Sequence, residues 1–139
     1  DINFFSIYQI NRNLILNKKD KKKLNIIMIG SLAGIETVGY LGYSAAKSVL
    51  FNYNKNLSKF FKKKNVISKL IVPSFFYSTG GSLERLKKRK PSIFDKINKK
   101  KPLSSKDIIE TINYLLKKES DSLNGSSIKQ TNSESNLVF

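Results

Sequence analysis

Two short apolar segments constrain the fold of this chain more than any other feature. They are "LNIIMIG" at 24–30 and "VISKLIVPS" at 66–74, and each is bounded by charged residues, Gly or Pro. Continuous apolar runs of this length are typical of strands buried in a parallel sheet. Between them lies an amphipathic helix at 43–61, with apolar residues at 46, 49, 50, 53, 57, 60 and 61. The order strand, helix, strand predicts an α/β fold with a parallel sheet.

The rest of the chain adds helical patterns and one strand. We expect a helix at 2–17, a loop with two short helices split by Pro91 at 75–102, a helix at 104–120, and a turn with a short strand at 123–131. This predicts one domain over 1–132 and a frayed tail over 133–139. A sheet of three strands is thin, and the first residues already have a helical pattern, so we expect the chain to be a fragment of a longer polypeptide.

The amino-acid composition limits which catalytic groups and metal ligands the chain can supply. The chain has no Cys and no His, which excludes disulfides, His-based triads and the usual zinc ligand sets. Acid–base chemistry therefore falls to Tyr, Lys, Asp or Glu. No apolar run approaches the roughly 20 residues that span a bilayer, and the first residues lack the pattern of a signal peptide. These absences predict a cytoplasmic protein with no membrane partner.

The net charge of +16 has two interpretations. A strong positive charge is typical of proteins that bind nucleic acid or another anionic partner. However, only 3 of the 26 basic residues are Arg, which is the residue preferred for gripping phosphates and bases. The lysines also fall in separate clusters at the ends of apolar segments. We therefore predict a solvated basic surface and no specific nucleic-acid partner.

Four polar residues form the candidate catalytic group. Tyr43 and Lys47 stand four apart in "YSAAK", so they share one face of the helix. Ser31 directly follows the first strand, 12 residues before Tyr43, and Asn3 stands 28 residues before Ser31 in "DIN". These residues and spacings resemble the short-chain dehydrogenases/reductases, whose signature is Y-x-x-x-K on a helix with a Ser upstream at a strand end. The resemblance continues through "LIVPSFFYST", "PLSSKDIIETINYLL" and "LNGSSIKQ", and covers about 1–132.

The resemblance implies a Rossmann-type parallel sheet with helices on both faces and a role for each residue. Tyr43 is the acid or base and also contacts the cofactor, and Lys47 binds the nicotinamide ribose. Ser31 positions the substrate oxygen, and Asn3 holds a water that relays protons. The pKa of a free tyrosine is near 10, and an adjacent ammonium lowers it. The small residues between Tyr43 and Lys47 leave room for cofactor and substrate. The implied reaction interconverts a carbonyl and a secondary alcohol with NAD or NADP.

The resemblance also implies cofactor contacts after the second strand. They are expected from Pro73, Ser74, and Ser78 or Thr79, where the family's offset favours Ser78. The equal alternative is that Ser78 and Thr79 are ordinary loop hydroxyls. The family usually has Gly after the Pro, and here Ser74 takes its place. The family's N-terminal Gly-rich turn, T-G-x-x-x-G-x-G, is missing from this chain, and "STGGSLER" at 78–85 follows no strand and is no phosphate loop. We therefore expect the chain alone to be inactive.

Three further expectations concern partners. Residues 75–102 would form a lid over the substrate, and "RLKKRK" at 85–90 either favours an anionic substrate or is a solvated surface. Helices 2–17 and 43–61 would join a second copy in a homodimer or homotetramer, as in the family; the alternative is that their apolar stripes only cover the sheet. The alternative function is a catalytically idle protein of the same fold that uses its basic surface on nucleic acid or an acidic partner.

Overall fold

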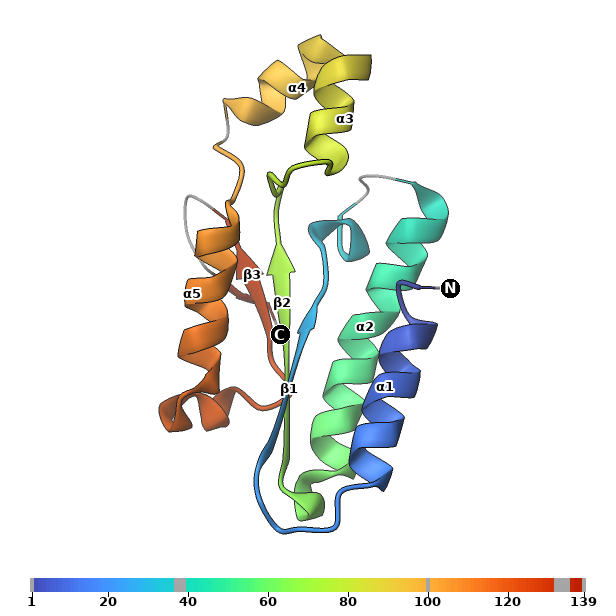
Figure 1. The fold of residues 1–139 in the computed structure, drawn as a ribbon, viewed down its shortest axis with the longest axis vertical. Helices are drawn as coiled ribbons and strands as arrows, with labels where there is room; N and C mark the ends of the chain where they lie inside the picture. Colours follow the sequence, from blue (N-terminus) through green and yellow to red (C-terminus); the bar gives the residue numbers. More distant parts are fainter. Residues whose placement is uncertain (1, 37–39, 100, 132–135, 139) are drawn as a thin grey trace.

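A computed structural model describes residues 2–36, 40–99, 101–131 and 136–138. A central sheet has helices α1 (Phe5–Leu16) and α2 (Leu41–Phe60) on one face and α5 (Ser105–Leu116) on the other (Figure 1). The predicted Rossmann-type arrangement, a parallel sheet with helices on both faces, is confirmed. Over the described ranges, no helix has both the length and the hydropathy needed to cross a membrane.

The sheet has the strand order β1-β2-β3-β4. Strands β1 (Leu24–Ile29), β2 (Val66–Pro73) and β3 (Ser127–Gln130) run parallel, and β4 (Asn136–Val138) pairs antiparallel with β3. The frayed tail expected over 133–139 stays a prediction: its residues 136–138 form β4, while 133–135 and 139 lie outside the described residues. The edge of β3 offers unpaired backbone groups, and the apolar end of the chain pairs with them.

Helices connect the strands and extend beyond the sheet. Helix α2 begins at Leu41, two residues earlier than predicted, and the expected loop before it contains a 3₁₀ helix, η1 (Leu32–Gly34). The two short helices expected around Pro91 are α3 (Ser82–Arg89) and α4 (Pro91–Asn98). The last predicted helix ends at Leu116 rather than at 120, because the chain turns into the 3₁₀ helix η3 (Lys118–Leu123); another, η2 (Lys62–Lys64), follows α2.

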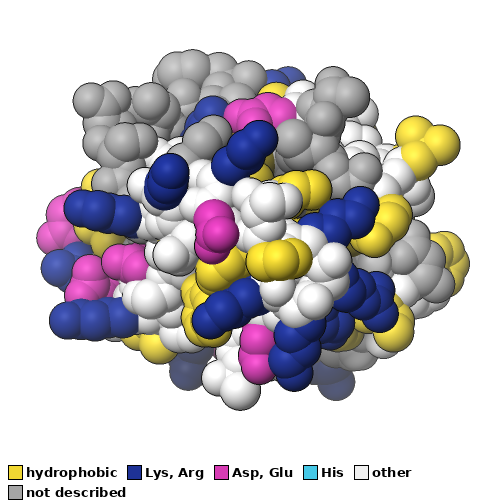
Figure 2. All heavy atoms as spheres, turned by 90° about the horizontal axis from the view of Figure 1, so that it is seen from above, with side chains coloured by type: hydrophobic (Ala, Val, Ile, Leu, Met, Phe, Trp, Pro, Cys, Tyr) yellow, Lys and Arg dark blue, Asp and Glu magenta, His cyan; other side chains and the backbone are white. Residues whose placement is uncertain are grey.

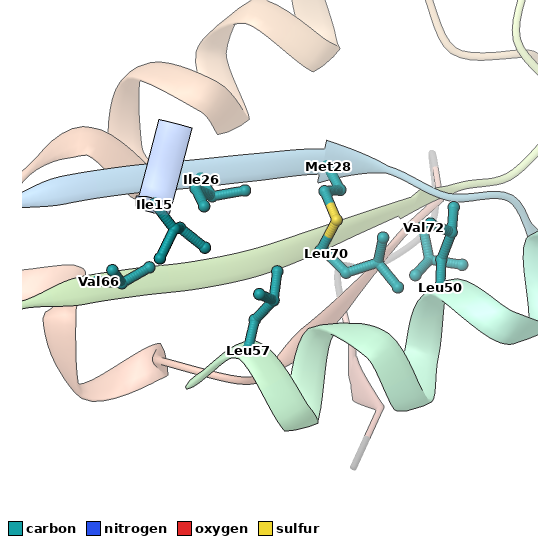
Figure 3. Packing of buried hydrophobic residues seen from close by; sticks show 8 residues of the cluster. All are labelled: Ile15, Ile26, Met28, Leu50, Leu57, Val66, Leu70 and Val72. Carbon is teal, nitrogen blue, oxygen red and sulfur yellow. The ribbon is translucent and has the colours of Figure 1, made fainter. Parts of the chain in front are cut away.

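The larger core lies between the sheet and the pair α1 and α2. Alternate residues of β2 point to this face, as the two-residue period of a strand requires. The cluster (Figure 3) comprises Ile15, Ile26, Met28, Leu50, Leu57, Val66, Leu70 and Val72. A smaller cluster on the opposite face joins β2 and β3 to α5, and comprises Ile71, Leu115 and Ile128.

The buried face of α2 matches the predicted apolar stripe only in part, because polar residues are buried beside Leu50 and Leu57. Its buried residues include Lys47, Asn54 and Ser58, whereas Phe60 is 78% exposed and Val49 44% exposed. Asn54 is buried because it is satisfied: its amide donates to the carbonyls of Gly125 and Ser126, and its oxygen accepts from Ser68. A buried polar group is tolerated when it is hydrogen-bonded in this way.

Candidate active site

The candidate site begins where β1 and β2 end side by side. Ile29 stands opposite Ile71 in the parallel register, and the next amide, that of Gly30, donates to the Ile71 carbonyl at 2.7 Å. Ser31 follows directly, while β2 continues to Pro73. The parallel register therefore carries Ser31 and Pro73 to the same carboxyl edge of the sheet, which is where ligands bind in open α/β sheets.

Ser31 is held by its own backbone turn. It is the N-cap of η1, and its Oγ accepts a hydrogen bond from the Ala33 amide at 3.2 Å. Its carbonyl accepts from the Gly34 amide at 3.0 Å. An oxygen that accepts in this way keeps its own hydroxyl proton for donation, so Ser31 is suited to donate to a substrate oxygen.

Lys47 is buried, with 9% of its surface exposed. Its ammonium donates to the carbonyl of Ile29 at 3.2 Å and lies 5.7 Å from the centre of the Tyr43 ring. Burial lowers the pKa of Lys47 below its ordinary value of 10.5, because the charged form loses hydration. The bond to Ile29 uses one of three ammonium protons, and among the residues that the structure describes no carboxylate forms an ion pair with Lys47.

Tyr43 lies one helical turn before Lys47, in the first turn of α2. Its side chain is 39% exposed, so a ligand at the sheet edge has access to the phenol. The structure therefore pairs an accessible phenol with a buried ammonium, as the spacing of "YSAAK" predicts.

Gly34 is part of this arrangement and was not singled out from the sequence. A Cβ built on Gly34 would lie 2.8 Å from the carbonyl carbon of Lys47, 2.9 Å from its oxygen and 2.9 Å from the Ser48 nitrogen. The η1 turn thus packs on the backbone of α2 at Lys47. The signal in the sequence was the run of small residues in "SLAG" after the strand, but nothing local distinguishes this Gly from one that merely permits a turn.

The predicted cofactor-contact residues follow the end of β2. Pro73 is buried, and the Ser74 amide donates to the Gln130 carbonyl at 2.9 Å, which ties this corner to β3. Further along, Ser78 is half-buried and Thr79 is exposed. The Ser78 carbonyl accepts from the Gly81 amide in the turn that leads into α3. All four lie between the carboxyl end of β2 and α3; their contact with a cofactor stays a prediction.

Asn3 lies in the turn before α1 and is half-buried. Its neighbour Phe4 packs edge-on against Tyr53 of α2, with ring centres 5.5 Å apart. Tyr53 stands ten residues beyond Tyr43, which is about 15 Å along a helix. The start of α1 is thus docked on α2, but its contacts there are with the middle of the helix, and the catalytic role of Asn3 stays a prediction.

Helices α3 and α4 stand beyond the carboxyl edge of the sheet (Figure 1). They carry an exposed basic surface, formed by Arg85, Lys87, Lys88, Arg89, Lys90, Lys96, Lys99 and Lys101. Seen from above this edge, basic side chains alternate with apolar and acidic ones (Figure 2). Lys87 lies 5.6 Å from the ring centre of Phe94, a contact that joins α3 to α4.

Known proteins resemble this chain in sequence and in fold. No family model matches the chain. A curated relative is the 3-oxoacyl-[acyl-carrier-protein] reductase FabG of Buchnera aphidicola subsp. Baizongia pistaciae (strain Bp), which is 28% identical over 126 residues. The match covers 90% of this chain and 51% of the relative. The chain therefore spans about half the length of the curated relative that it matches.

Solved structures share the fold at low sequence identity. An oxidoreductase of the short chain dehydrogenase/reductase family from Burkholderia thailandensis is 18% identical with a TM-score of 0.77, covering 93% of this chain and 52% of its own. A 4-hydroxyisoleucine dehydrogenase mutant complexed with NADH and succinate is 21% identical with a TM-score of 0.81, covering 97% and 58%. A putative NAD(P)-dependent gluconate 5-dehydrogenase from Beutenbergia cavernae, with bound NADP, is 11% identical with a TM-score of 0.74, covering 92% and 52%.

Proposed function

We propose that this chain, which resembles the C-terminal half of the short-chain dehydrogenases/reductases in sequence and in fold, is the catalytic half of an NAD(P)-dependent oxidoreductase. The reaction is the interconversion of a carbonyl and a secondary alcohol. The observation that carries the proposal is the buried Lys47 ammonium beside the accessible phenol of Tyr43, at the carboxyl edge of a parallel sheet.

Tyr43 is the proton donor and acceptor in this proposal. In the reducing direction, the substrate carbonyl carbon gains a hydride while its oxygen takes the phenolic proton of Tyr43, which gives the alcohol and leaves a phenolate. The cofactor, when bound, supplies that hydride and accepts it in the oxidising direction. The phenolate then recovers a proton from solvent, and we propose Asn3 as the residue that holds the relaying water. Ser31 donates its hydroxyl proton to the substrate oxygen and orients it.

Lys47 supplies the charge that makes a tyrosine usable in this role. Its ammonium is desolvated and lies close to the ring, so it stabilises negative charge on the phenolate more strongly than an exposed lysine would. The bond to the Ile29 carbonyl holds the long side chain in one orientation. Because one proton satisfies that bond, the ammonium keeps donors for the nicotinamide ribose.

The donor groups at this edge fit the nicotinamide half of NAD(P). Residues 73–83 carry hydroxyl groups at 74, 77, 78, 79 and 82 and no acidic residue, and the Glu84 carboxylate that follows accepts a hydrogen bond from the Gly80 amide at 2.6 Å. Ser74 and Ser78 are half-buried, so each offers a hydroxyl at a partly enclosed position. This chain has no T-G-x-x-x-G-x-G turn for the adenosine half. We therefore propose that these 139 residues alone do not turn over, and we leave the choice between NAD and NADP open.

The name of the curated relative supports a choice of first substrate. The Buchnera reductase is named for 3-oxoacyl-[acyl-carrier-protein], so a 3-oxoacyl thioester is the first substrate to test. The exposed cations of α3 and α4 would suit an anionic group on the substrate, or they only keep the surface solvated.

We also propose self-association through α1 and α2. Both helices expose large apolar side chains that the sheet does not cover, namely Phe5, Ile10, Leu14, Leu16, Val49 and Phe60. An apolar surface of this kind is typical of an interface between protein chains.

The test starts at the reading frame before Asp1. About 100 upstream codons, the length that the remainder of such a domain needs, should encode a strand followed by T-G-x-x-x-G-x-G. The protein from the full frame should then oxidise NADH or NADPH with a 3-oxoacyl thioester. Tyr43→Phe should lower kcat by about 100-fold or more.

The matched control is Tyr40→Phe, the same change at a side chain that is 85% exposed, three residues earlier; it should keep full activity. A Tyr43→Phe protein as active as the wild type would exclude the proposed mechanism. A frame that encodes no Gly-rich turn, with salt-dependent binding of nucleic acid or an acidic protein, would instead favour the idle binding protein.

A further inference from the structure

We propose that Gly34 is a positioning residue, whose missing side chain sets the place of the Ser31 hydroxyl relative to Lys47 and Tyr43. The inference rests on the proposed function and adds to it a residue that carries no reactive group. It comes from the way in which the segment 29–34 holds Lys47.

The first contact is between backbones. Gly34 lies so close to α2 that a Cβ there would be 2.8 Å from the Lys47 carbonyl carbon and 2.9 Å from the Lys47 oxygen and the Ser48 nitrogen. These three atoms belong to one peptide group inside a helix. A helical peptide cannot rotate away as the end of a flexible side chain can, because its hydrogen bonds to neighbouring turns fix it.

The second contact is with the side chain of the same lysine. The Lys47 ammonium donates to the Ile29 carbonyl at 3.2 Å. Ile29 and Gly34 stand two residues before and three residues after Ser31. The segment that carries Ser31 therefore touches both ends of Lys47, its ammonium and its peptide group.

Ser31 has little freedom between these two contacts. Its carbonyl accepts from the Gly34 amide at 3.0 Å, and its Oγ accepts from the Ala33 amide at 3.2 Å. Any movement of Gly34 away from α2 must therefore carry Ser31 along. The packing of Gly34 on α2 thus fixes the position of the Ser31 hydroxyl, which orients the substrate, relative to Lys47.

A methyl group at position 34 should displace the Ser31 hydroxyl relative to Lys47. Ordinary contacts of a Cβ lie at 3.4–4 Å, so Gly34→Ala requires η1 to retreat from α2 by about half an ångström or more. Misplacement of a reacting group by about 1 Å lowers rates by about 100-fold. We therefore expect Gly34→Ala to lower kcat by about 10- to 100-fold, with the cofactor KM changed less than kcat.

The matched control is Gly42→Ala. It makes the same chemical change in the first turn of α2, where a Cβ would meet nothing within 4 Å. We expect this variant to keep its kcat, and to gain thermal stability because Ala is the better helix former. Both variants are made in the protein from the full reading frame and assayed for NAD(P)H oxidation.

Measuring the effect of Gly34→Ala in a Ser31→Ala background separates a role in positioning the Ser31 hydroxyl from a general loss of structure. If Gly34 acts by placing the Ser31 hydroxyl, then Gly34→Ala should cost little more once Ser31→Ala has removed that hydroxyl. The role is overturned if Gly34→Ala keeps the wild-type kcat, or if it lowers kcat by the same factor in both backgrounds. Additive losses would mean that the two residues act independently.

Two further outcomes need an interpretation: a Gly34→Ala variant that does not fold, and a wild-type protein without activity. If Gly34→Ala does not fold, Ala33→Gly replaces it, because it loosens the same turn without adding an atom; a kcat equal to that of the wild type would then overturn the role. A wild-type protein without activity on any carbonyl substrate would overturn the proposed function itself. An active wild type with an unaffected Gly34→Ala variant would overturn only the role of Gly34.

Discussion

Replacing Lys47 by Met tests the electrostatic core of the proposed mechanism. Methionine keeps the apolar stem of the side chain and removes the charge and the bond to Ile29. The ammonium lies 5.7 Å from the centre of the Tyr43 ring. At about this separation, with an effective dielectric constant of about 20, a unit charge stabilises a phenolate by about 3 kcal/mol. That free energy corresponds to a factor of about 100 in rate.

The assay is alcohol oxidation by the protein from the full reading frame, measured from about pH 6 to 11 so that the titration of tyrosine and lysine is covered. Lys47→Met should lower the rate near neutral pH by about 100-fold. In the wild type, activity should fall at alkaline pH, and Lys47→Met should remove this fall. Burial lowers the pKa of Lys47 below 10.5, so the stabilising charge is lost before an exposed lysine would titrate.

The control is Lys55→Met, which removes an exposed lysine two turns further along α2. It should leave both the rate and the pH profile unchanged. A Lys47→Met protein whose rate falls by less than about threefold, or that keeps the alkaline fall of the wild type, would refute the reasoning from the 5.7 Å separation.

Two other predictions concern stability and assembly. Lys69 is 1% exposed and donates to the Leu115 carbonyl at 2.6 Å and to Ser120 at 2.7 Å, and burial lowers its pKa below 10.5. The unfolded state then binds more protons between the folded-state pKa and 10.5, so the free energy of unfolding should rise with pH across that window. In urea titrations, Lys69→Met should remove this rise and stay within about 1–2 kcal/mol of the wild type at pH 7, whereas a loss of stability above about 4 kcal/mol would contradict it. Phe60→Asp, at a site 78% exposed, should lower the mass measured by light scattering, and an unchanged oligomer would exclude this part of the interface.

The sequence predicted the elements that depend on short-range patterns. The strand at 24–30 and the strand at 66–74 were found because both are apolar runs with clear boundaries, and the observed strands are Leu24–Ile29 and Val66–Pro73. Tyr43 and Lys47 were paired from their spacing alone, because residues four apart must share a face of any helix.

The buried face of α2 could not be predicted fully from its apolar pattern, because it depends on hydrogen-bond partners that are distant in the sequence. The polar residue Asn54 breaks the apolar stripe, so the sequence placed the buried face of α2 nearer Val49 and Phe60. In the structure Asn54 is buried because Gly125, 71 residues away, supplies a carbonyl acceptor. Lys69 is likewise buried in β2 because Leu115 and Ser120 meet its ammonium. Hydrophobicity alone carries no information about such partners.

By itself the sequence determined the α/β order of elements, the residue types of the candidate site and the spacing that pairs Tyr43 with Lys47, because these depend on chain-local geometry. Only the tertiary structure decided that Lys47 is desolvated and that its two ends are held by Ile29 and Gly34. The physical reason is that burial and close backbone approach are properties of two segments in contact, and neither segment encodes the position of the other.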